Sequence, residues 1–250
     1  MAEHPPFRNA GNAGPFTLDG TRTYRVGDRS TAVLDPGPDV ADHIRALVVW
    51  LRDAEDVRVV VTHAHRDHAG GARRLADALG VPVQGPRGVV GVDMGLGDGD
   101  TIRTDAGMLV ALDTPGHAER HLCFAWPERA AVFVGDLLLG RGDTTWVAEY
   151  RGCVADYLES LRKVRRSAPG VLYPTHGDPI TDVAAALDRY EAHRRARIRQ
   201  VASALRARPD ASSDELLVAV YGPDIPLAVV GAARRSIEAL VEYVRTRTES

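Results

Sequence analysis

Four residues able to bind a metal ion lie within six consecutive positions of the sequence. Residues 62–71 read Thr-His-Ala-His-Arg-Asp-His-Ala-Gly-Gly, with imidazoles at His63, His65 and His68 and a carboxylate at Asp67. Imidazole nitrogens and carboxylate oxygens bind zinc and similar ions, and a catalytic site leaves one coordination position to water. Without a shared partner, titratable groups crowded in this way would repel or desolvate one another. The spacing therefore predicts a metal site rather than a solvated polar loop.

The flanking residues predict a rigid support for this cluster. The apolar run 57–61 precedes it and is too short and too β-branched for a helix, so it predicts a buried strand. Gly70 and Gly71 allow a tight turn before a helix over 72–79, which should end at Gly80. The cluster is therefore expected on a strand-to-helix loop, where rigid elements can direct several side chains at one point.

Three later segments repeat the pattern of a short apolar strand that ends in a ligand-type residue. The residues at these strand ends are His117, Asp136 and His176. We expect one edge of the sheet system to gather them beside His63 and His65. His121 starts a strand four residues after His117 and fits either packing or a pocket. The histidines at positions 4, 43 and 193 lack such a context and are predicted at the surface.

Composition places the chain among ordinary globular proteins. It has 250 residues, 44% hydrophobic and 26% charged, with a net charge of -3, which suits one large domain with a small appendage. Cys123 and Cys153 fit neither a disulfide framework nor a zinc ribbon, so we expect both to be free. No stretch approaches the ~18 apolar residues of a membrane span, and residues 1–6 do not resemble a signal peptide. These features predict a cytoplasmic protein with no membrane partner.

The remaining segments alternate between strands and helices before a helical tail. We expect an irregular segment over 1–16, strands over 21–26 and 31–35, a helix over 40–51 with Asp39 as its N-cap, an edge strand over 81–83, a loop over 85–99, a hairpin over 121–134 and a helix over 156–166. In the tail, residues 183–208 predict one long helix or two close ones, Ser212 and Glu215 a capping box, and Pro226 the start of a final helix.

Together, four motifs resemble those of the metallo-β-lactamase fold superfamily. They are residues 62–68, Thr-Pro-Gly-His at 114–117, Gly-Asp at 135–136 and Pro-Thr-His-Gly at 174–177. Residues 14–27 and the tail are similar to the β-lactamase-like protein 2 group, a neighbour of glyoxalase II. Ala13, Arg22 and Thr175 depart from the pattern of that group, which leaves the substrate open. The resemblance implies an α/β fold: an αββα sandwich over 1–188 and a small helical, winged-helix-like domain over 189–250.

The resemblance also implies the roles of individual residues. His63, His65 and His117 would hold a first zinc ion, Asp67, His68 and His176 a second, and Asp136 would bridge the two. Asp67 would also act in catalysis by orienting the hydroxide, and His121 and Arg22 would contact substrate. The expected cofactor is two Zn²⁺ per chain, with iron or manganese as alternatives. The tail should dock on the hydrolase domain and form one wall of the cleft. Arg194, Arg195 and Arg197 lie near this junction, where each fits either a solvated helix face or a contact with an anionic part of the substrate.

Two such metals would supply hydroxide at neutral pH for attack on a carbonyl or phosphoryl centre. We therefore expect a cytoplasmic dinuclear zinc hydrolase in which a metal-bound hydroxide cleaves an ester, thioester or related acyl bond of a small-molecule or acyl substrate. The ligands determine the reaction type and not the substrate, so a single-strand endoribonuclease, a β-lactamase or lactonase, and a non-enzymatic binding module stay as alternatives. The arginines over 189–199 support a nucleic-acid partner, but the negative net charge weighs against one. The oligomeric state stays open.

Overall fold

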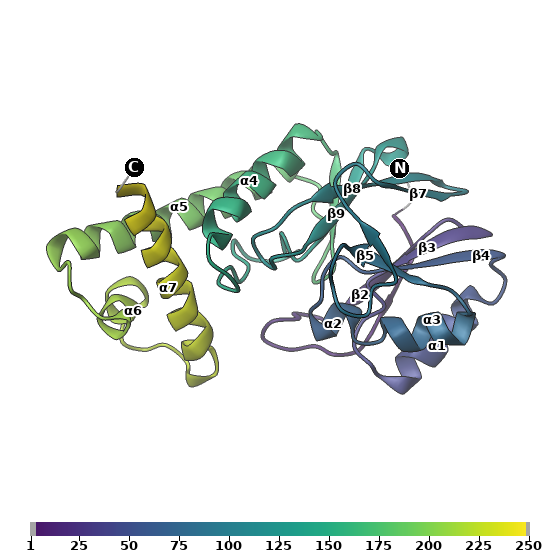
Figure 1. The fold of residues 1–250 in the computed structure, drawn as a ribbon, viewed down its shortest axis with the longest axis horizontal. Helices are drawn as coiled ribbons and strands as arrows, with labels where there is room; N and C mark the ends of the chain where they lie inside the picture. Colours follow the sequence, from purple (N-terminus) through teal and green to yellow (C-terminus); the bar gives the residue numbers. More distant parts are fainter. Residues whose placement is uncertain (1–3, 249–250) are drawn as a thin grey trace.

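The computed structural model describes residues 4–248, which form two β-sheets packed face to face (Figure 1). The first sheet contains, in spatial order, β1 (Phe7–Asn9), β2 (Arg22–Val26), β3 (Ser30–Leu34), β4 (Asp56–Val60), β5 (Val83–Pro86) and β6 (Met94–Leu96). The second contains β11 (Val171–Pro174), β10 (Ala131–Gly135), β9 (Leu122–Trp126), β8 (Gly107–Asp113) and β7 (Thr101–Thr104). A 3-10 turn, η1 (Pro127–Arg129), joins β9 to β10 as the predicted hairpin.

Helices cover the outer face of each sheet (Figure 1). On the first sheet these are α1 (Ala41–Leu51) and α3 (Ala72–Leu79), with the short α2 (Arg66–Ala69) between β4 and α3. On the second sheet they are α4 (Cys153–Arg166) and the start of α5 (Val183–Ala207). The layers therefore run helix, sheet, sheet, helix, and the predicted α/β sandwich is confirmed.

Strand side chains alternate between the layers, which explains the continuous apolar runs in the sequence. Val59 and Val61 pack against α1 and α3, whereas Val60 lies between the two sheets. In β10, Val132 packs toward α4 and Phe133 lies between the sheets. Because successive strand side chains point to opposite faces, a strand covered on both faces must be apolar throughout.

Three predictions about the first sheet are wrong in detail. β1 lies in the segment 1–16 that was expected to be irregular, and β6 lies in the expected loop 85–99. β5 is not an edge strand, because β6 pairs with it in parallel from Met94 to Leu96. The side chains of β1 are exposed and those of β6 are exposed or half-buried. These strands form by backbone pairing at the edge of the sheet. Their side chains face solvent, so the sequence shows no regular alternation of apolar and polar residues there.

The start of α1 also differs from the prediction. Val40 is the N-cap residue, and no side chain bonds to the free backbone N–H groups there. Asp39 instead forms an ion pair with Arg74 of α3, with 2.8 Å between the carboxylate and Nε. A tertiary partner therefore replaces the local capping role expected of Asp39. The expected end of α3 is confirmed, since Gly80 has a left-handed φ of 69°.

The tail consists of α5, α6 (Ser213–Tyr221) and α7 (Leu227–Thr248). α5 is a single helix of 25 residues, and the predicted domain boundary after residue 188 falls inside it. The capping box of Ser212 and Glu215 is confirmed. Up to Thr248 the tail contains helices and no strand, so its helical character is confirmed and its likeness to a winged helix stays a prediction, as does the domain boundary.

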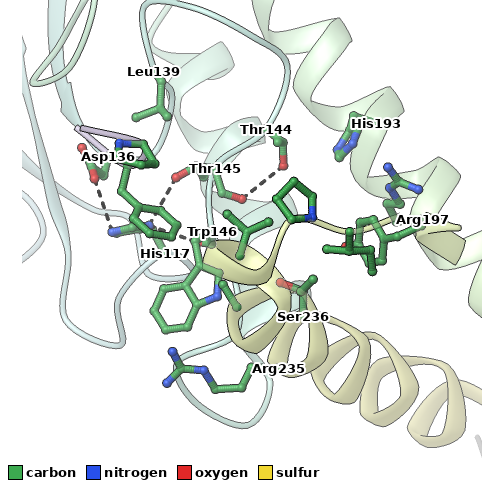
Figure 2. A pocket seen from close by; sticks show the side chains of 18 of the residues that line it. His117, Asp136, Leu139, Thr144, Thr145, Trp146, His193, Arg197, Arg235 and Ser236 are labelled. Carbon is green, nitrogen blue, oxygen red and sulfur yellow. Dashed lines mark hydrogen bonds and ion pairs between the residues drawn. The ribbon is translucent and has the colours of Figure 1, made fainter. Parts of the chain in front are cut away.

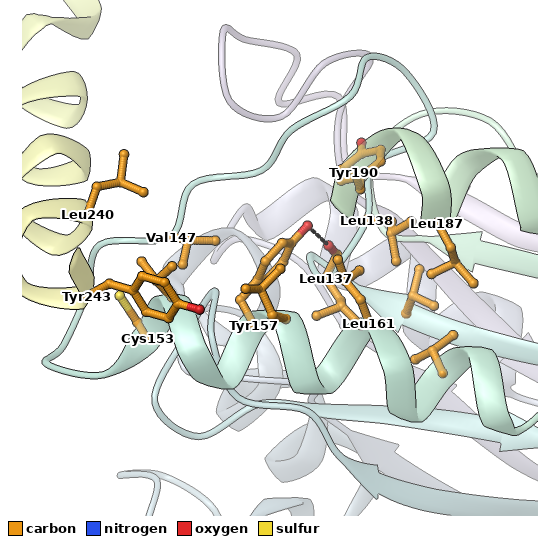
Figure 3. Packing of buried hydrophobic residues seen from close by; sticks show 14 of the residues in the cluster. Leu137, Leu138, Val147, Cys153, Tyr157, Leu161, Leu187, Tyr190, Leu240 and Tyr243 are labelled. Carbon is orange, nitrogen blue, oxygen red and sulfur yellow. Dashed lines mark hydrogen bonds between the residues drawn. The ribbon is translucent and has the colours of Figure 1, made fainter. Parts of the chain in front are cut away.

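The tail packs on the sandwich as predicted. Ile237 and Leu240 of α7 are fully buried in one apolar cluster with Tyr157 of α4. Figure 3 shows Leu240 and Tyr157 in this cluster. The backbone N–H of Gly152, just before α4, donates to Glu242 of α7 at 3.3 Å.

Within residues 4–248 no helix combines the length and the apolar character needed to cross a membrane.

Candidate metal centre

All seven predicted metal ligands converge at one edge of the sandwich. The loop after β4 and helix α2 supply four of them, and three later strand-end loops supply one each. The ligand-type residues are His63, His65, Asp67 and His68 on the first loop, His117 after β8, Asp136 after β10 and His176 after β11. The prediction that strand ends gather these side chains is therefore confirmed.

The turn that places His117 requires a glycine. Gly116 has a φ of +135°, and a Cβ atom there would lie 2.5 Å from the Cα atom of Tyr157 in α4. A helix backbone cannot move aside for a side chain, so only glycine permits this close approach. The Thr-Pro-Gly-His motif thus holds His117 by packing its loop directly against α4.

His63, His65 and His117 form the first group, whose nitrogen ligand atoms all lie within 4.8 Å of one another. His65 presents Nδ1, which lies 3.0 Å from Nε2 of His117. The other nitrogen of His65, Nε2, lies 3.5 Å from Oε1 of Glu149. Glu149 was not expected at the site, and it holds the His65 ring so that Nδ1 faces the group.

Asp67, His68 and His176 form the second group, again with ligand atoms within 4.8 Å of one another. Asp67 Oδ2 lies 3.2 Å from Nε2 of His176 and 3.8 Å from Nε2 of His68. The two histidine side chains are fully buried, whereas that of Asp67 is 31% exposed. Asp67 therefore lies on the open side of the group.

Asp136 lies between the two groups. Its Oδ2 atom is 3.5 Å from Nε2 of His117 in the first group. Its Oδ1 atom is 3.4 Å from Nε2 of His68 and 3.5 Å from Nε2 of His176 in the second group. One carboxylate oxygen thus faces each group, which is the arrangement that a carboxylate bridging two cations needs.

Hydrogen bonds from the outer ring nitrogens orient these histidines. Nδ1 of His117 donates to the carbonyl of Trp146 at 2.9 Å, and Nδ1 of His176 donates to the carbonyl of Gly20 at 3.1 Å. His63 bonds through Nδ1 to Thr62 Oγ1 at 2.9 Å. Since Nδ1 carries the proton in each case, Nε2 keeps a free lone pair toward the centre.

Several inward-facing atoms have no hydrogen-bond partner among the residues described. These buried atoms are Nε2 of His63, His68 and His176 and Oδ1 of Asp136. Buried polar atoms in folded proteins almost always have a partner, so several orphans at one point indicate a missing ligand. Neutral imidazole nitrogens and a carboxylate oxygen are donors for divalent metals. The residues present therefore fit a metal centre.

Asp35 organises these loops, and sequence reasoning did not identify it. Its buried carboxylate accepts hydrogen bonds from Thr62 N at 2.7 Å, Thr62 Oγ1 at 2.9 Å, His68 Nδ1 at 2.8 Å and Thr175 Oγ1 at 2.8 Å. It thereby ties the loop after β3 to those after β4 and β11. The signal available in the sequence was a carboxylate at the end of an apolar strand, immediately before the Pro-Gly-Pro of residues 36–38.

Burial and neighbouring charges set the protonation of the ligands. Burial, reinforced by adjacent imidazoles, holds the pKa of His63 well below its ordinary value, and burial lowers the pKa of His117 to about 4. Burial also acts to lower the pKa of His68, but the carboxylates of Asp136 and Asp35 outweigh it and raise that pKa. Burial acts to raise the pKa of Asp136, but the imidazoles of His68 and His176 outweigh it and hold that pKa far below its usual range. His63 and His117 are therefore neutral, which is the form that binds cations, whereas His68 must release a proton when a cation binds.

His121 does not lie where a substrate contact was expected. Its ring is fully buried, with Nδ1 2.9 Å from Thr114 Oγ1 and Nε2 accepting from the backbone N–H of Asp136 at 3.3 Å. A buried ring with both nitrogens bonded has no free edge for a substrate, so His121 supports the loop of Asp136 instead. His43 was predicted at the surface but is also buried.

Arg22 lies away from the metal centre, contrary to its expected contact with substrate. Its guanidinium is buried, pairs with Asp19 at 2.8 Å and with Asp178 at 2.7 Å, and stacks over the ring of Phe7. It lines a separate depression that includes Tyr24 but none of the seven metal-site residues. Two carboxylates and an aromatic ring fix Arg22 as a structural cation.

A cavity of about 670 Å³ opens on the metal centre (Figure 2). At one end its walls include His65, Asp67, His117 and Asp136. The tail supplies the opposite wall, through residues of α5, α7 and the segment between α6 and α7. The predicted contribution of the tail to the cleft is therefore confirmed. His193, predicted at the surface, is half-buried and lines this cavity.

Comparison with known proteins gives the same fold and the same family. The family model described as the Metallo-beta-lactamase superfamily matches residues 17–176. The structure is similar to that of a beta-lactamase domain protein from Burkholderia ambifaria, with a TM-score of 0.81 and 22% identity over 94% of this chain and 85% of that one.

Two curated relatives are more similar in sequence. A beta-lactamase-like protein 2 homolog of Caenorhabditis elegans is 32% identical over 92% of this chain and 80% of its own length. An atrochrysone carboxyl ACP thioesterase of Aspergillus chevalieri is 38% identical over 79% of this chain. The chain spans 64% of the length of that thioesterase.

Proposed function

The chain belongs to the metallo-β-lactamase superfamily and is a hydrolase, and we propose that it cleaves a thioester or a related acyl bond. The observation that carries this proposal is the metal centre with its unpartnered buried donors, placed at one end of a cavity of about 670 Å³. Cavities of this size enclose small organic ligands. The match to a relative named as an ACP thioesterase supports the choice of acyl bond.

We propose that the site holds two zinc ions, with iron or manganese as alternatives. His63, His65 and His117 would hold one ion, Asp67, His68 and His176 the other, and Asp136 would contact both. When bound, such ions polarise an acyl oxygen and make hydroxide available at neutral pH. The presence of one oxygen of Asp136 toward each histidine group supports this division.

The protein residues orient the reactants. Asp67 faces the cavity from the open side of the second group, so its carboxylate can accept a hydrogen bond from the attacking water and fix its direction. Asp35 and Thr62 keep the histidines in the tautomer that leaves Nε2 free. Trp146 and Phe16 line the cavity and limit the access of bulk water to the acyl bond.

The walls of the cavity support an acyl substrate with an apolar body. Apolar and aromatic side chains dominate the lining beyond the metal centre: Pro15, Phe16, Leu139, Trp146, Tyr221, Ile225, Pro226 and Val229. Such surfaces favour apolar groups, while the metal centre supplies the polar recognition.

Both cysteines are buried and unpaired, which supports the cytoplasm as the compartment.

The endoribonuclease alternative has less support. It needs arginines that are free to meet phosphates along a strand. Arg194 is buried, however, and Arg195 pairs with Glu191 at 2.7 Å. A β-lactamase or lactonase activity uses the same centre and differs only in the acyl bond that is cleaved.

A hydrolysis screen of the metal-loaded protein tests the proposal. The panel contains aryl and alkyl thioesters, lactones, nitrocefin and single-stranded RNA. We expect the highest kcat/KM for a thioester, with none of that activity after chelation. A higher kcat/KM for RNA or nitrocefin would refute the choice of acyl substrate while leaving the metal centre intact.

A further inference from the structure

The wall of the cavity formed by α5 contains buried nitrogen atoms without partners. Arg194 of α5 is only 4% exposed, lines the cavity, and its Nε atom has no hydrogen-bond partner in the structure as described. Nδ1 of the neighbouring His193 is likewise buried and unpartnered. Figure 2 shows His193 and Arg197 together on the side of the cavity opposite His117 and Asp136.

The arginines of this cavity wall lack carboxylate partners, unlike their neighbour along the helix. Arg194 donates to the carbonyl of Thr145 at 3.0 Å and stacks over the ring of Tyr157. Arg197, one turn further on, donates to the carbonyl of Val220 at 2.8 Å and stacks over a tyrosine ring. Within residues 4–248 neither forms an ion pair, whereas Arg195 pairs with Glu191.

A buried guanidinium without an anion is costly, because the loss of hydration is not offset by a counter-charge. Carbonyl oxygens and aromatic faces offset part of this cost. An oxyanion in the cavity would offset more, since guanidinium N–H groups match carboxylate and phosphate oxygens in geometry. The carboxylate of Asp224 also lines the cavity but is exposed.

One residue connects this end of the cavity to the metal centre. Thr145 accepts from Arg194 through its carbonyl, and its Oγ1 lies 3.3 Å from Nδ1 of His117. A negative charge held at Arg194 is therefore separated from a metal ligand by the width of a single residue. An anion at Arg194 and an acyl bond at the metal centre are therefore close enough to belong to one substrate molecule.

We propose that Arg194 and Arg197, with His193, form a subsite for an anionic group on the substrate, separate from the acyl bond that is cleaved. The inference rests on the proposed acyl hydrolysis and adds the class of substrate: an acyl compound with an apolar body and a carboxylate or phosphate. The charge could be a carboxylate on the acyl part or the phosphate of a phosphopantetheine thiol. Arg194 and Arg197 are positioning residues, since they bind the substrate away from the reacting atoms.

Three matched thioesters test the subsite. The first is a neutral benzoyl thioester of N-acetylcysteamine, the second carries a carboxylate on the benzoyl ring, and the third is benzoyl phosphopantetheine. We expect Arg194→Gln and Arg197→Gln to lower kcat/KM for a charged substrate by roughly 10- to 100-fold, mainly through KM, as for a lost charge-assisted hydrogen bond. The neutral thioester should change by less than about 3-fold.

Arg195→Gln is the matched control, because Arg195 is one residue from Arg194 but bonds to Glu191. It should leave kcat/KM for all three substrates unchanged. If Arg194→Gln does not fold, the half-buried Arg197 still carries the test. Equal losses on neutral and charged thioesters, or a loss in Arg195→Gln as large as in the other two variants, would overturn the subsite. The charged substrate that loses most identifies the source of the anion.

A binding measurement separates the subsite from the proposed reaction. Calorimetry with amide analogues of the same three compounds reports affinity even if wild-type protein hydrolyses no thioester. Tighter binding of a charged analogue, lost in Arg194→Gln and retained in Arg195→Gln, would support the subsite while the acyl hydrolysis fails. Identical affinities for charged and neutral analogues in wild-type protein would refute the subsite whatever the hydrolysis assay gives.

Discussion

The two ends of the cavity are held in place by different kinds of interaction. At the metal end, short loops are fixed by buried hydrogen bonds, four of which converge on the carboxylate of Asp35. At the other end, the wall is helical and is fixed by apolar packing of residues such as Ile237 and Leu240 against α4. Hydrogen bonds within the loops restrict the directions in which the ligand side chains point, whereas packed helices restrict the shape of the cavity wall.

The two ends of the cavity therefore have different structural requirements. The metal end needs ligand atoms held in narrow ranges of angle and distance, which polar networks provide. The tail end needs only to fit a substrate body and one charge, so its residues can change while the fold and metal centre persist. We therefore expect losses at the metal end to abolish the reaction and losses at the tail end to alter stability and substrate choice.

Removal of metal should have the largest effect. We expect about two divalent metals per chain by elemental analysis, and activity at background after chelation, because the hydroxide source is lost. Addition of zinc, iron or manganese should restore it. Full activity in protein shown to contain no metal would contradict both the metal centre and the division between the two ends.

Asp136→Asn should follow in size. The amide keeps the shape of the side chain but loses the charge that faces both histidine groups. We expect loss of about one metal per chain and a fall in kcat/KM of roughly 100-fold or more, since even residues that only support ligands cost 10- to 100-fold. Circular dichroism should be unchanged. Normal turnover at full metal loading would show that Asp136 is not a ligand.

Deletion of residues 209–250 tests the tail end as a whole. It removes α6 and α7 and exposes apolar residues of α4 and α5 that they cover. We expect a lower melting temperature and a changed substrate preference, with the seven metal-site residues still in place. An unchanged melting temperature with the full substrate profile would mean that the tail is an independent appendage.

A milder change at the same end is Ile237→Ala. The side chain of Ile237 on α7 is fully buried in the apolar cluster that joins α7 to α4. We expect the free energy of unfolding to fall by about 2–4 kcal/mol, as for other large-to-small core substitutions, with metal content unchanged. Chemical denaturation and elemental analysis measure the two quantities. Loss of metal in this variant would show that the two ends are coupled rather than separate.

Thr175→Val should have the smallest effect. The hydroxyl of Thr175 donates one of the bonds to Asp35, whose carboxylate keeps bonds from Thr62 and His68. We expect a loss of about 1 kcal/mol in unfolding free energy and no change in the number of metals bound. A loss of metal comparable to that of Asp136→Asn would mean that Asp35 needs every bond to hold the loops.

Sequence alone predicted the seven ligand-type residues of the metal end, because their signals are local, but not Asp35 and Glu149, which orient them. The four ligand-type residues of the stretch 62–71 reveal themselves by spacing, and His117, Asp136 and His176 by following short strands. The layer order was implied by the resemblance to the metallo-β-lactamase fold, and it explains why Val59, Val60 and Val61 are all apolar, since both faces of that strand are covered. Strands β1 and β6 could not be predicted from the sequence, because strands that pair at an exposed sheet edge lack a regular alternation of apolar and polar side chains.

Only the tertiary structure assigned the remaining residues. Nothing local distinguishes Arg194 from Arg195, but successive residues of a helix point about 100° apart, so packing buries the first in the cavity wall and leaves the second with Glu191. In the same way, the fold brings together residues that are far apart in the sequence: Arg22 pairs with Asp178, and Asp35 accepts a hydrogen bond from Thr175. Sequence spacing determines which atoms can meet within a loop, whereas the packing of whole elements decides which loops and helices face one another.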